Sequence, residues 1–204
     1  MERLPYNLNV ALELAGKKLQ AKTPGDLARA KKVIWKEERR EIHCPSLGDL
    51  YCINYPSGEI REKNGQDVDP RFQVLLLHYL TGPGTSVHGE WISFKELPGG
   101  ALYRQPFYGR AIGPLIKTFG SSPDRFLKAG LALGGQTAGV GDAGIILYPF
   151  PLVPVCIALW AGDEEIPPNG TILFDASVTE HLPTEDCAVL AEYLVRRLRK
   201  AVPR

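Results

Sequence analysis

Residues 145–175 read IILYPFPLVPVCIALWAGDEEIPPNGTILFD and contain three apolar runs separated by turn-forming residues. The runs are Ile145–Tyr148, Val155–Trp160 and Thr171–Phe174, and their length and continuous apolar character predict buried β-strands. The apolar stretch from Gly144 to Trp160 contains three prolines and is shorter than the ~20 apolar residues of a membrane-spanning helix. The segment therefore predicts buried strands and no membrane span.

The sequence before these strands predicts helices around a β-rich middle. Apolar residues recur at helical spacing near the start, at Leu4, Leu8, Leu12, Ala15 and Leu19. Thr23 and Pro24 are typical first residues of a second, short helix. Residues 33–60 contain short β-prone runs with turns at SLGD and PSGE, which predicts an antiparallel meander of three or four strands. Asp69 and Pro70 then begin an apolar helix that ends at Gly82.

The remaining elements complete an α+β pattern. We expect a strand at residues 90–94, helices at 108–119 and 123–133, and a last helix from Thr184. Strands and helices do not alternate regularly, which excludes a doubly wound sheet. The sequence predicts a single α+β domain over residues 1–204, with a mixed, mainly antiparallel sheet formed by the N-terminal meander and the C-terminal strands and packed by about five helices. It does not decide whether these strands form one sheet or two.

Composition excludes several classes of function. The chain has 204 residues, with 24 basic and 23 acidic side chains, so its net charge of +1 disfavours a nucleic-acid partner and an anionic membrane surface. The first residues lack the apolar core of a signal peptide, so we expect a cytoplasmic protein. The four cysteines are widely spaced and contain no CxxC pair, which argues against a zinc ribbon or an iron–sulfur motif.

One glycine-rich segment resembles a nucleotide-binding motif. Residues 139–144, GVGDAG, match GxGxxG. That fingerprint needs a strand before it and a helix after it, whereas here a predicted helix precedes and a predicted strand follows. We interpret Gly134–Gly144 as a loop that either closes over a ligand or simply reverses the chain, and Asp142 within it is a candidate ligand-binding residue.

Histidine and cysteine spacing encodes no metal site. His78 lies seven residues after Arg71 on one helical stripe, so an anion could bridge the two; the alternative is a histidine bonded to a backbone carbonyl. His43 and Cys44 are adjacent, which points them to opposite faces of a strand. A catalytic cysteine–histidine pair would need another combination, for instance Cys52 with a distant histidine, and nothing in the spacing supports that choice.

The acidic loop after Trp160 is the main candidate for a site. Asp163, Glu164 and Glu165 follow a strand end, and Asp175 ends the next apolar run. Carboxylates that pack together out of water have raised pKa values and suit acid–base chemistry or a hard cation. The alternative is a solvated loop held extended by Pro167 and Pro168.

Several segments together resemble one family. They are GEWISFKELPGG at 89–100, Gly141-Asp142-Ala143, the strand bracketed by Pro151 and Pro154, LWAGDEEIPP, and LFD followed by a Leu-Pro-x-Glu-Asp helix start. Over nearly the whole chain the sequence resembles the bacterial domain of unknown function 3786 family. The resemblance implies a protein found largely in anaerobic bacteria. Some relatives carry an added cysteine-rich iron–sulfur segment; this chain lacks it, and no redox role or other activity is carried over.

Three hypotheses follow. The first is a non-redox accessory or binding protein whose glycine loop and acidic loop border one pocket for a small polar ligand, a metal or an organometallic cofactor. Its walls would be Trp160 and Trp91, and its polar groups Asp142, Asp163, Glu164, Glu165 and Asp175, with His78 as a further candidate. The second is a carboxylate-dependent hydrolase or acid–base enzyme, with or without a divalent cation. The third is a scaffold or homodimer with an interface at Trp91, Tyr103, Phe107 and Tyr108. The sequence does not choose between enzyme and binding protein, and it identifies no cofactor.

Overall fold

The N-terminal meander forms a sheet of its own. In the computed structural model, which describes residues 8–202, this sheet has the order β1-β2-β3-β4, with strands β1 Ile34–Lys36, β2 Glu41–Ser46, β3 Asp49–Asn54 and β4 Ile60–Glu62. Leu47 and Gly48 connect β2 to β3 with positive φ angles of 51° and 82°, as a tight two-residue hairpin turn requires. Every strand pair is antiparallel, so the predicted meander is confirmed with four strands.

The apolar runs of the C-terminal half form a second antiparallel sheet. Its order is β5-β9-β8-β7-β6, with strands β5 Trp91–Ser93, β6 Gln136–Ala138, β7 Ala143–Phe150, β8 Val153–Trp160 and β9 Asn169–Asp175. Strand β8 is buried along its length except at Trp160, as its continuous apolar sequence predicts. The sequence did not predict β6, which occupies part of the glycine-rich segment and pairs with β7.

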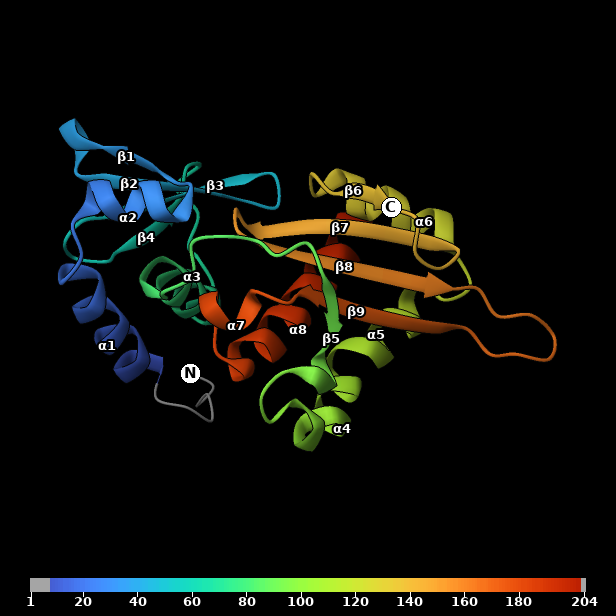
Figure 1. Cartoon of the computed structure of the whole chain (residues 1–204). Helices are drawn as coiled ribbons and strands as arrows, with labels where there is room; N and C mark the ends of the chain where they lie inside the picture. Colours follow the sequence, from blue (N-terminus) through green and yellow to red (C-terminus); the bar gives the residue numbers. More distant parts are fainter. Residues whose placement is uncertain (1–7, 203–204) are drawn as a thin grey trace.

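Helices cover both sheets (Figure 1). They are α1 Leu8–Gln20, α2 Pro24–Lys31, α3 Pro70–Thr81, α4 Arg104–Phe107, α5 Gly113–Phe119, α6 Pro123–Ala132, α7 Val178–His181 and α8 Thr184–Ala201. Short 3₁₀ turns lie at Glu37–Arg39, Phe94–Glu96 and Gly100–Tyr103, and Tyr108–Ile112 is a π-helical turn between α4 and α5. Leu4, predicted for the first helix, lies outside the described residues. Among the described residues, no helix has the length and apolarity needed to cross a bilayer.

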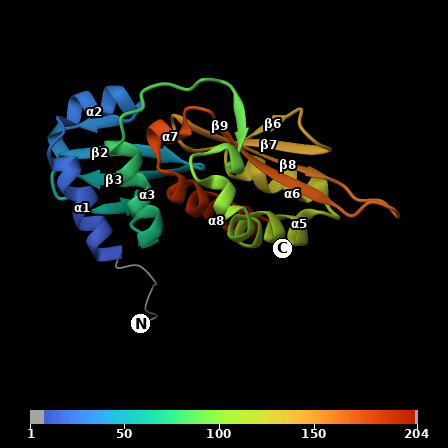
Figure 2. The same ribbon diagram turned by 60° about the horizontal axis from the view of Figure 1, so that its bottom comes forward.

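Helix α8 joins the two sheets into one core. Helices α5, α6 and α8 lie along one face of the five-stranded sheet, while α1 and α3 lie against the four-stranded one (Figure 2). The Phe72 ring of α3 stacks on Tyr193 of α8 at 4.6 Å and on Phe150 of β7 at 5.6 Å between ring centres. Arg197 of α8 donates to Asp49 of β3 at 2.7 Å. Buried residues of both sheets belong to one apolar cluster, and the α+β class is confirmed.

The segment of residues 82–90 crosses from α3 to β5 over the boundary between the sheets (Figure 1). Each half of the protein holds it by hydrogen bonds. Lys31 Nζ of α2 donates to the Gly84 carbonyl at 2.5 Å, and the Gly84 N–H donates to the Glu180 carbonyl of α7 at 2.7 Å. This crossing segment therefore ties α2 to α7.

Candidate functional site

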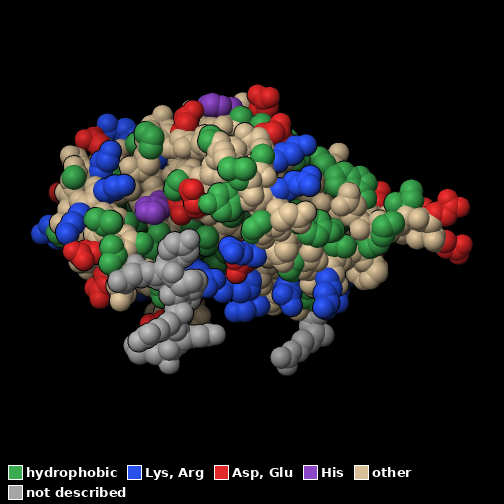
Figure 3. Space-filling view, turned by 90° about the horizontal axis from the view of Figure 1, so that it is seen from below, with side chains coloured by type: hydrophobic (Ala, Val, Ile, Leu, Met, Phe, Trp, Pro, Cys, Tyr) green, Lys and Arg blue, Asp and Glu red, His purple; other side chains and the backbone are tan. Residues whose placement is uncertain are grey.

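The acidic loop between β8 and β9 is a projecting hairpin end. Residues 161–167 are exposed, and Figure 1 shows the loop extending beyond the sheet; in Figure 3 acidic side chains lie at the projecting end of the molecule. The Asp163 carboxylate accepts hydrogen bonds from the N–H groups of Glu165 at 2.9 Å and Ile166 at 2.7 Å. These backbone donors lower the pKa of Asp163. Its carboxylate therefore stabilises the turn.

Asp142 connects the glycine-rich segment to the acidic loop. Its carboxylate accepts a hydrogen bond from the Ala161 N–H at 2.7 Å, and its own N–H donates to the Leu159 carbonyl at 2.9 Å. Gly141, at a positive φ of 69°, turns the chain beside Trp160. The structure thus brings Asp142, Trp160 and the acidic triplet together at one end of the second sheet, and ligand binding there stays a prediction.

Asp175 lies at the opposite end of β9. In the sheet register Trp160 pairs with Asn169, whereas Asp175 pairs with Trp91. Asn169 and Asp175 are six residue steps apart along an extended strand, a distance of about 20 Å. The predicted single pocket between Trp160 and Trp91 is therefore not formed, because the two tryptophans and the two groups of acids lie at opposite ends of one strand.

The Asp175 carboxylate is buried and fully engaged. It is 2% exposed and accepts hydrogen bonds from the N–H groups of His88 at 2.9 Å, Gly89 at 2.7 Å and Ser177 at 3.0 Å, and from Ser177 Oγ at 2.6 Å. Burial acts to raise its pKa, but the hydroxyl and backbone donors outweigh it and lower the pKa. Asp175 anchors the crossing segment and is ionised. Neither Asp163 nor Asp175 shows the raised pKa that the acid–base hypothesis required.

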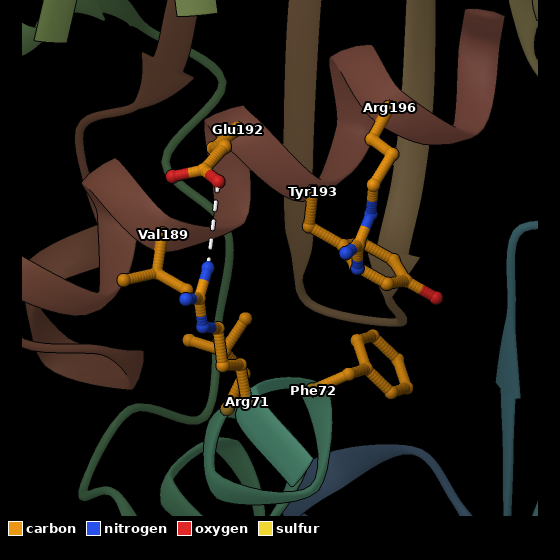
Figure 4. A pocket seen from close by; sticks show the side chains of 7 residues that line it. Arg71, Phe72, Val189, Glu192, Tyr193 and Arg196 are labelled. Carbon is orange, nitrogen blue, oxygen red and sulfur yellow. Dashed lines mark hydrogen bonds and ion pairs between the residues drawn. The ribbon is translucent and has the colours of Figure 1, made fainter. Parts of the chain in front are cut away.

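His78 and Arg71 do not share an anion. His78 Nδ1 lies 2.6 Å from an Asp186 oxygen, and Arg71 Nη1 lies 3.5 Å from a Glu192 oxygen, so each is paired with an acid of α8. Figure 4 shows the Arg71 pair beside a cavity of about 10 Å³ between α3 and α8. That volume holds about one water molecule. Neither the anion bridge nor the alternative of a backbone-carbonyl partner describes His78, because α8 supplies a carboxylate partner to both His78 and Arg71.

The predicted aromatic interface is also reduced. Phe107 is buried and stacks on Phe94 with ring centres 4.1 Å apart, whereas Trp91, Tyr103 and Tyr108 are exposed. A hollow of about 510 Å³ next to the start of α6 contains none of the predicted site residues. Its lining includes Ser122, Arg125 and Lys128.

The outer face of the first sheet carries a group of side chains that sequence spacing did not reveal. Alternate residues of β2 and β3 point into the core, and these are Ile42, Cys44, Tyr51 and Ile53. Their neighbours Glu41, His43 and Cys52 share the other face. The two-residue turn sets the register: Ser46 pairs with Asp49, so His43, three residues before, pairs with Cys52, three residues after.

These three side chains form a compact group of metal-ligating atoms. One ligand atom each from Glu41, His43 and Cys52 lies within 4.8 Å of the other two. His43 Nε2 is 2.9 Å from Glu41 Oε2, and Arg61 Nη2 of β4 donates to Glu41 Oε1 at 2.5 Å. The Glu41 and His43 side chains are 10% and 12% exposed, and Cys52 is 3% exposed. The group is therefore shielded but lies directly beneath the surface.

The electrostatics of the group favour an ionised carboxylate and a protonated thiol. The hydrogen bond with His43 and the ion pair with Arg61 outweigh burial and lower the pKa of Glu41. Burial raises the pKa of the Cys52 thiol, a negative Glu41 adds to the effect, and Arg61, Lys63 and Arg39 oppose it. A free thiol in this setting is unreactive, whereas binding of a metal ion deprotonates it.

The sequence contained one signal for this group. The SLGD turn between two β-prone runs fixes the register of the two strands. Counting outward from a two-residue turn at Leu47 and Gly48 places Cys52 opposite His43. Spacing alone supports no histidine partner for Cys52, whereas the structure places His43, nine residues earlier in the chain, beside it. Spacing motifs such as CxxC miss ligands that meet across a hairpin.

Comparison with known proteins identifies the family. A family model described as "Domain of unknown function (DUF3786)" matches residues 23–197. The chain belongs to the DUF3786 family. The match begins just before α2 and includes both sheets and most of α8 of this DUF3786 member, so the suspected resemblance is confirmed. Neither a curated protein nor a solved structure matches the chain.

Proposed function

We propose that this DUF3786 protein binds one divalent transition-metal ion through Glu41, His43 and Cys52. The observation that carries the proposal is the convergence of a carboxylate, an imidazole and a thiol within 4.8 Å on one sheet face. Carboxylate, imidazole and thiolate are the three ligand types found at zinc sites. Magnesium and calcium bind oxygen ligands, so a site with an imidazole and a thiolate does not favour them.

The distances suit a small ion with modest side-chain movement. Metal–ligand bonds of about 2.0–2.3 Å place the ligand atoms of a tetrahedral site about 3.3–3.6 Å apart. The nitrogen of His43 and the oxygen of Glu41 are already 2.9 Å apart. Rotation of the Cys52 side chain and a small spreading of the other pair complete three corners of the tetrahedron.

A site with three protein ligands has a fourth position for a small molecule. This is the arrangement of zinc sites that bind water or substrate, and it differs from the closed four-ligand sites that only support a fold. We place the role in a non-redox accessory or binding protein of the bacterial cytoplasm, where cysteines stay reduced, in agreement with the four free cysteines of the chain. The family resemblance supports an anaerobic host.

A cobalt titration tests the proposal. Reduced, chelator-treated protein titrated with Co²⁺ should develop the near-ultraviolet charge-transfer absorption of a cobalt–thiolate bond. Cys52→Ser should abolish this absorption, and His43→Gln should weaken binding at least tenfold. Zn²⁺ at a hundredfold excess over its Kd should stabilise the fold by about 2.7 kcal/mol, a melting shift of about 5–10 °C for a chain of this size.

Two matched variants control for the residue types. Cys44→Ala removes a thiol from the position next to His43, on the core face of β2. His88→Gln removes a histidine that pairs with a glutamate at 3.3 Å in an exposed position outside the group. Both should retain the cobalt absorption. Absence of the absorption in the intact protein, or its persistence in Cys52→Ser, would refute the assignment.

A further inference from the structure

We infer that the fourth position of this metal site takes a small oxyanion, a carboxylate or a phosphate, and that Arg61 is its second anchor. The inference rests on the proposed metal site and specifies its ligand class. It follows from the place of Arg61 next to the three ligands, from the charges around them, and from the geometry of a guanidinium group.

The sheet register places Arg61 beside the ligands. Arg61 of β4 pairs with Cys52 of β3, which in turn pairs with His43 of β2, so the three residues form one row across the strands. Its Nη2 is held by Glu41 at 2.5 Å, which fixes the guanidinium next to a metal ligand. The metal ion and Arg61 would therefore face the same small volume above the sheet.

Arg61 has donors to spare. Half of its side chain is exposed, and within residues 8–202 its other guanidinium N–H groups make no hydrogen bond. A guanidinium offers five N–H donors in a planar fork that matches two oxygens of a carboxylate or phosphate. One amino group bound to Glu41 leaves the remaining edge of this fork for a ligand.

The charge of the occupied site favours an anion. Glu41 and a Cys52 thiolate balance the two charges of the metal ion. Arg61, Lys63 and Arg39 are cations that also act on the Cys52 sulfur. The occupied site is thus positive, and an oxyanion that binds the metal with one oxygen and Arg61 with another neutralises it.

A competing account makes Arg61 a purely structural partner of Glu41. In that account Arg61 only repels the cation and occupies a ligand oxygen, so Arg61→Ala would tighten Co²⁺ binding and leave any effect of anions on the cobalt spectrum unchanged. In ours, Arg61→Ala keeps Co²⁺ binding but loses affinity for the oxyanion. The response to anions separates the two accounts.

The test uses the full-length protein loaded with Co²⁺. Inorganic phosphate and acetate are titrated separately while the visible cobalt bands are recorded, because these bands respond to a new oxygen ligand. We expect a saturable change with one of them, and the better ligand distinguishes a phosphate from a carboxylate. Arg61→Ala should weaken the effective anion at least tenfold, as the loss of charge-assisted hydrogen bonds predicts, and Arg61→Lys should fall between the two.

The controls separate failure of the inference from failure of the proposed function. Arg29→Ala, which removes an exposed arginine paired with Asp26 at 3.5 Å, should behave like the wild type. Cobalt binding with no anion response, or an equal response in wild type and Arg61→Ala, overturns the oxyanion inference and leaves the metal site standing. Absence of cobalt binding overturns both.

Discussion

Lys31 carries a buried positive charge whose cost can be measured. Its side chain lies under the crossing segment, 2% exposed, with Nζ bound to the Gly84 carbonyl and 5.3 Å from the centre of the Tyr79 ring. Burial, aided by the charge of Lys22, lowers the pKa of Lys31 to about 8. The folded protein therefore holds the Lys31 proton less tightly than the unfolded chain does.

The magnitude follows from the two pKa values. Lowering the Lys31 pKa from 10.5 to about 8 costs the folded state about 3 kcal/mol while the amine is charged in both states. As the pH rises through 8 the folded state releases the proton first, so the penalty falls to about 1.5 kcal/mol at pH 9.5. Lys31→Met has no such penalty at any pH. The wild type should therefore gain about 2 kcal/mol of stability relative to Lys31→Met between pH 7 and pH 9.5.

Urea unfolding of both proteins at several pH values, in the presence of reductant and followed by tryptophan fluorescence, measures this difference. Cysteine and tyrosine side chains titrate in both proteins, so their contributions cancel in the difference between the two unfolding free energies. Lys36→Met, at an exposed position of β1, should keep a constant offset from the wild type across the same range. If the free-energy difference between wild type and Lys31→Met is also constant, the lowered pKa of Lys31 is refuted.

Two further variants test packing and buried hydrogen bonds. Asp175→Ala leaves the N–H groups of His88, Gly89 and Ser177 without their acceptor and should destabilise the fold by about 2–4 kcal/mol in urea unfolding. Asp163→Ala, in the exposed loop, should change the free energy of unfolding little. Equal effects of the two variants would contradict the roles assigned to these aspartates. Gly130→Ala places a Cβ 2.5 Å from Ile145 Cγ1 and should cost about 1–3 kcal/mol despite the higher helix propensity of alanine. Gly25→Ala, which meets no atom within 4 Å, should be neutral or stabilising, and similar melting temperatures for the two alanine variants would show that the α6–β7 contact yields easily.

The local elements of the fold follow from the sequence because their signals are local. The almost unbroken apolar runs of β7 and β8 reflect burial on both faces, and the Asp69-Pro70 start of α3 is confirmed by a hydrogen bond from the Arg71 N–H to the Asp69 side chain at 2.9 Å. The short strand β6 was missed because three residues among glycines carry no periodic pattern. The division into two sheets depends on tertiary pairing, which no local pattern reports.

The candidate site is harder to predict because residues that are close in the sequence can lie far apart along a strand, and residues farther apart can meet across a hairpin. Asp163 and Asp175 are only twelve residues apart in the sequence, which suggests one acidic group, yet β9 separates them by its whole length. No spacing motif links His43 to Cys52, yet the turn at Leu47 and Gly48 places them side by side. The strand register decides both the separation of the two aspartates and the pairing of His43 with Cys52. The pairing can be predicted by counting outward from the two-residue turn.

Helix α8 also determines when the protein can finish folding during its synthesis. Its Tyr193 and Arg197 reach Phe72 and Asp49, so α8 must leave the ribosome before the packing of the first sheet, as well as that of the second, is complete. Until α8 has been made, the apolar underside of the N-terminal strands lacks part of its cover and is a surface for chaperones. A nonsense codon just before α8 would therefore damage both sheets, including the one that is made first.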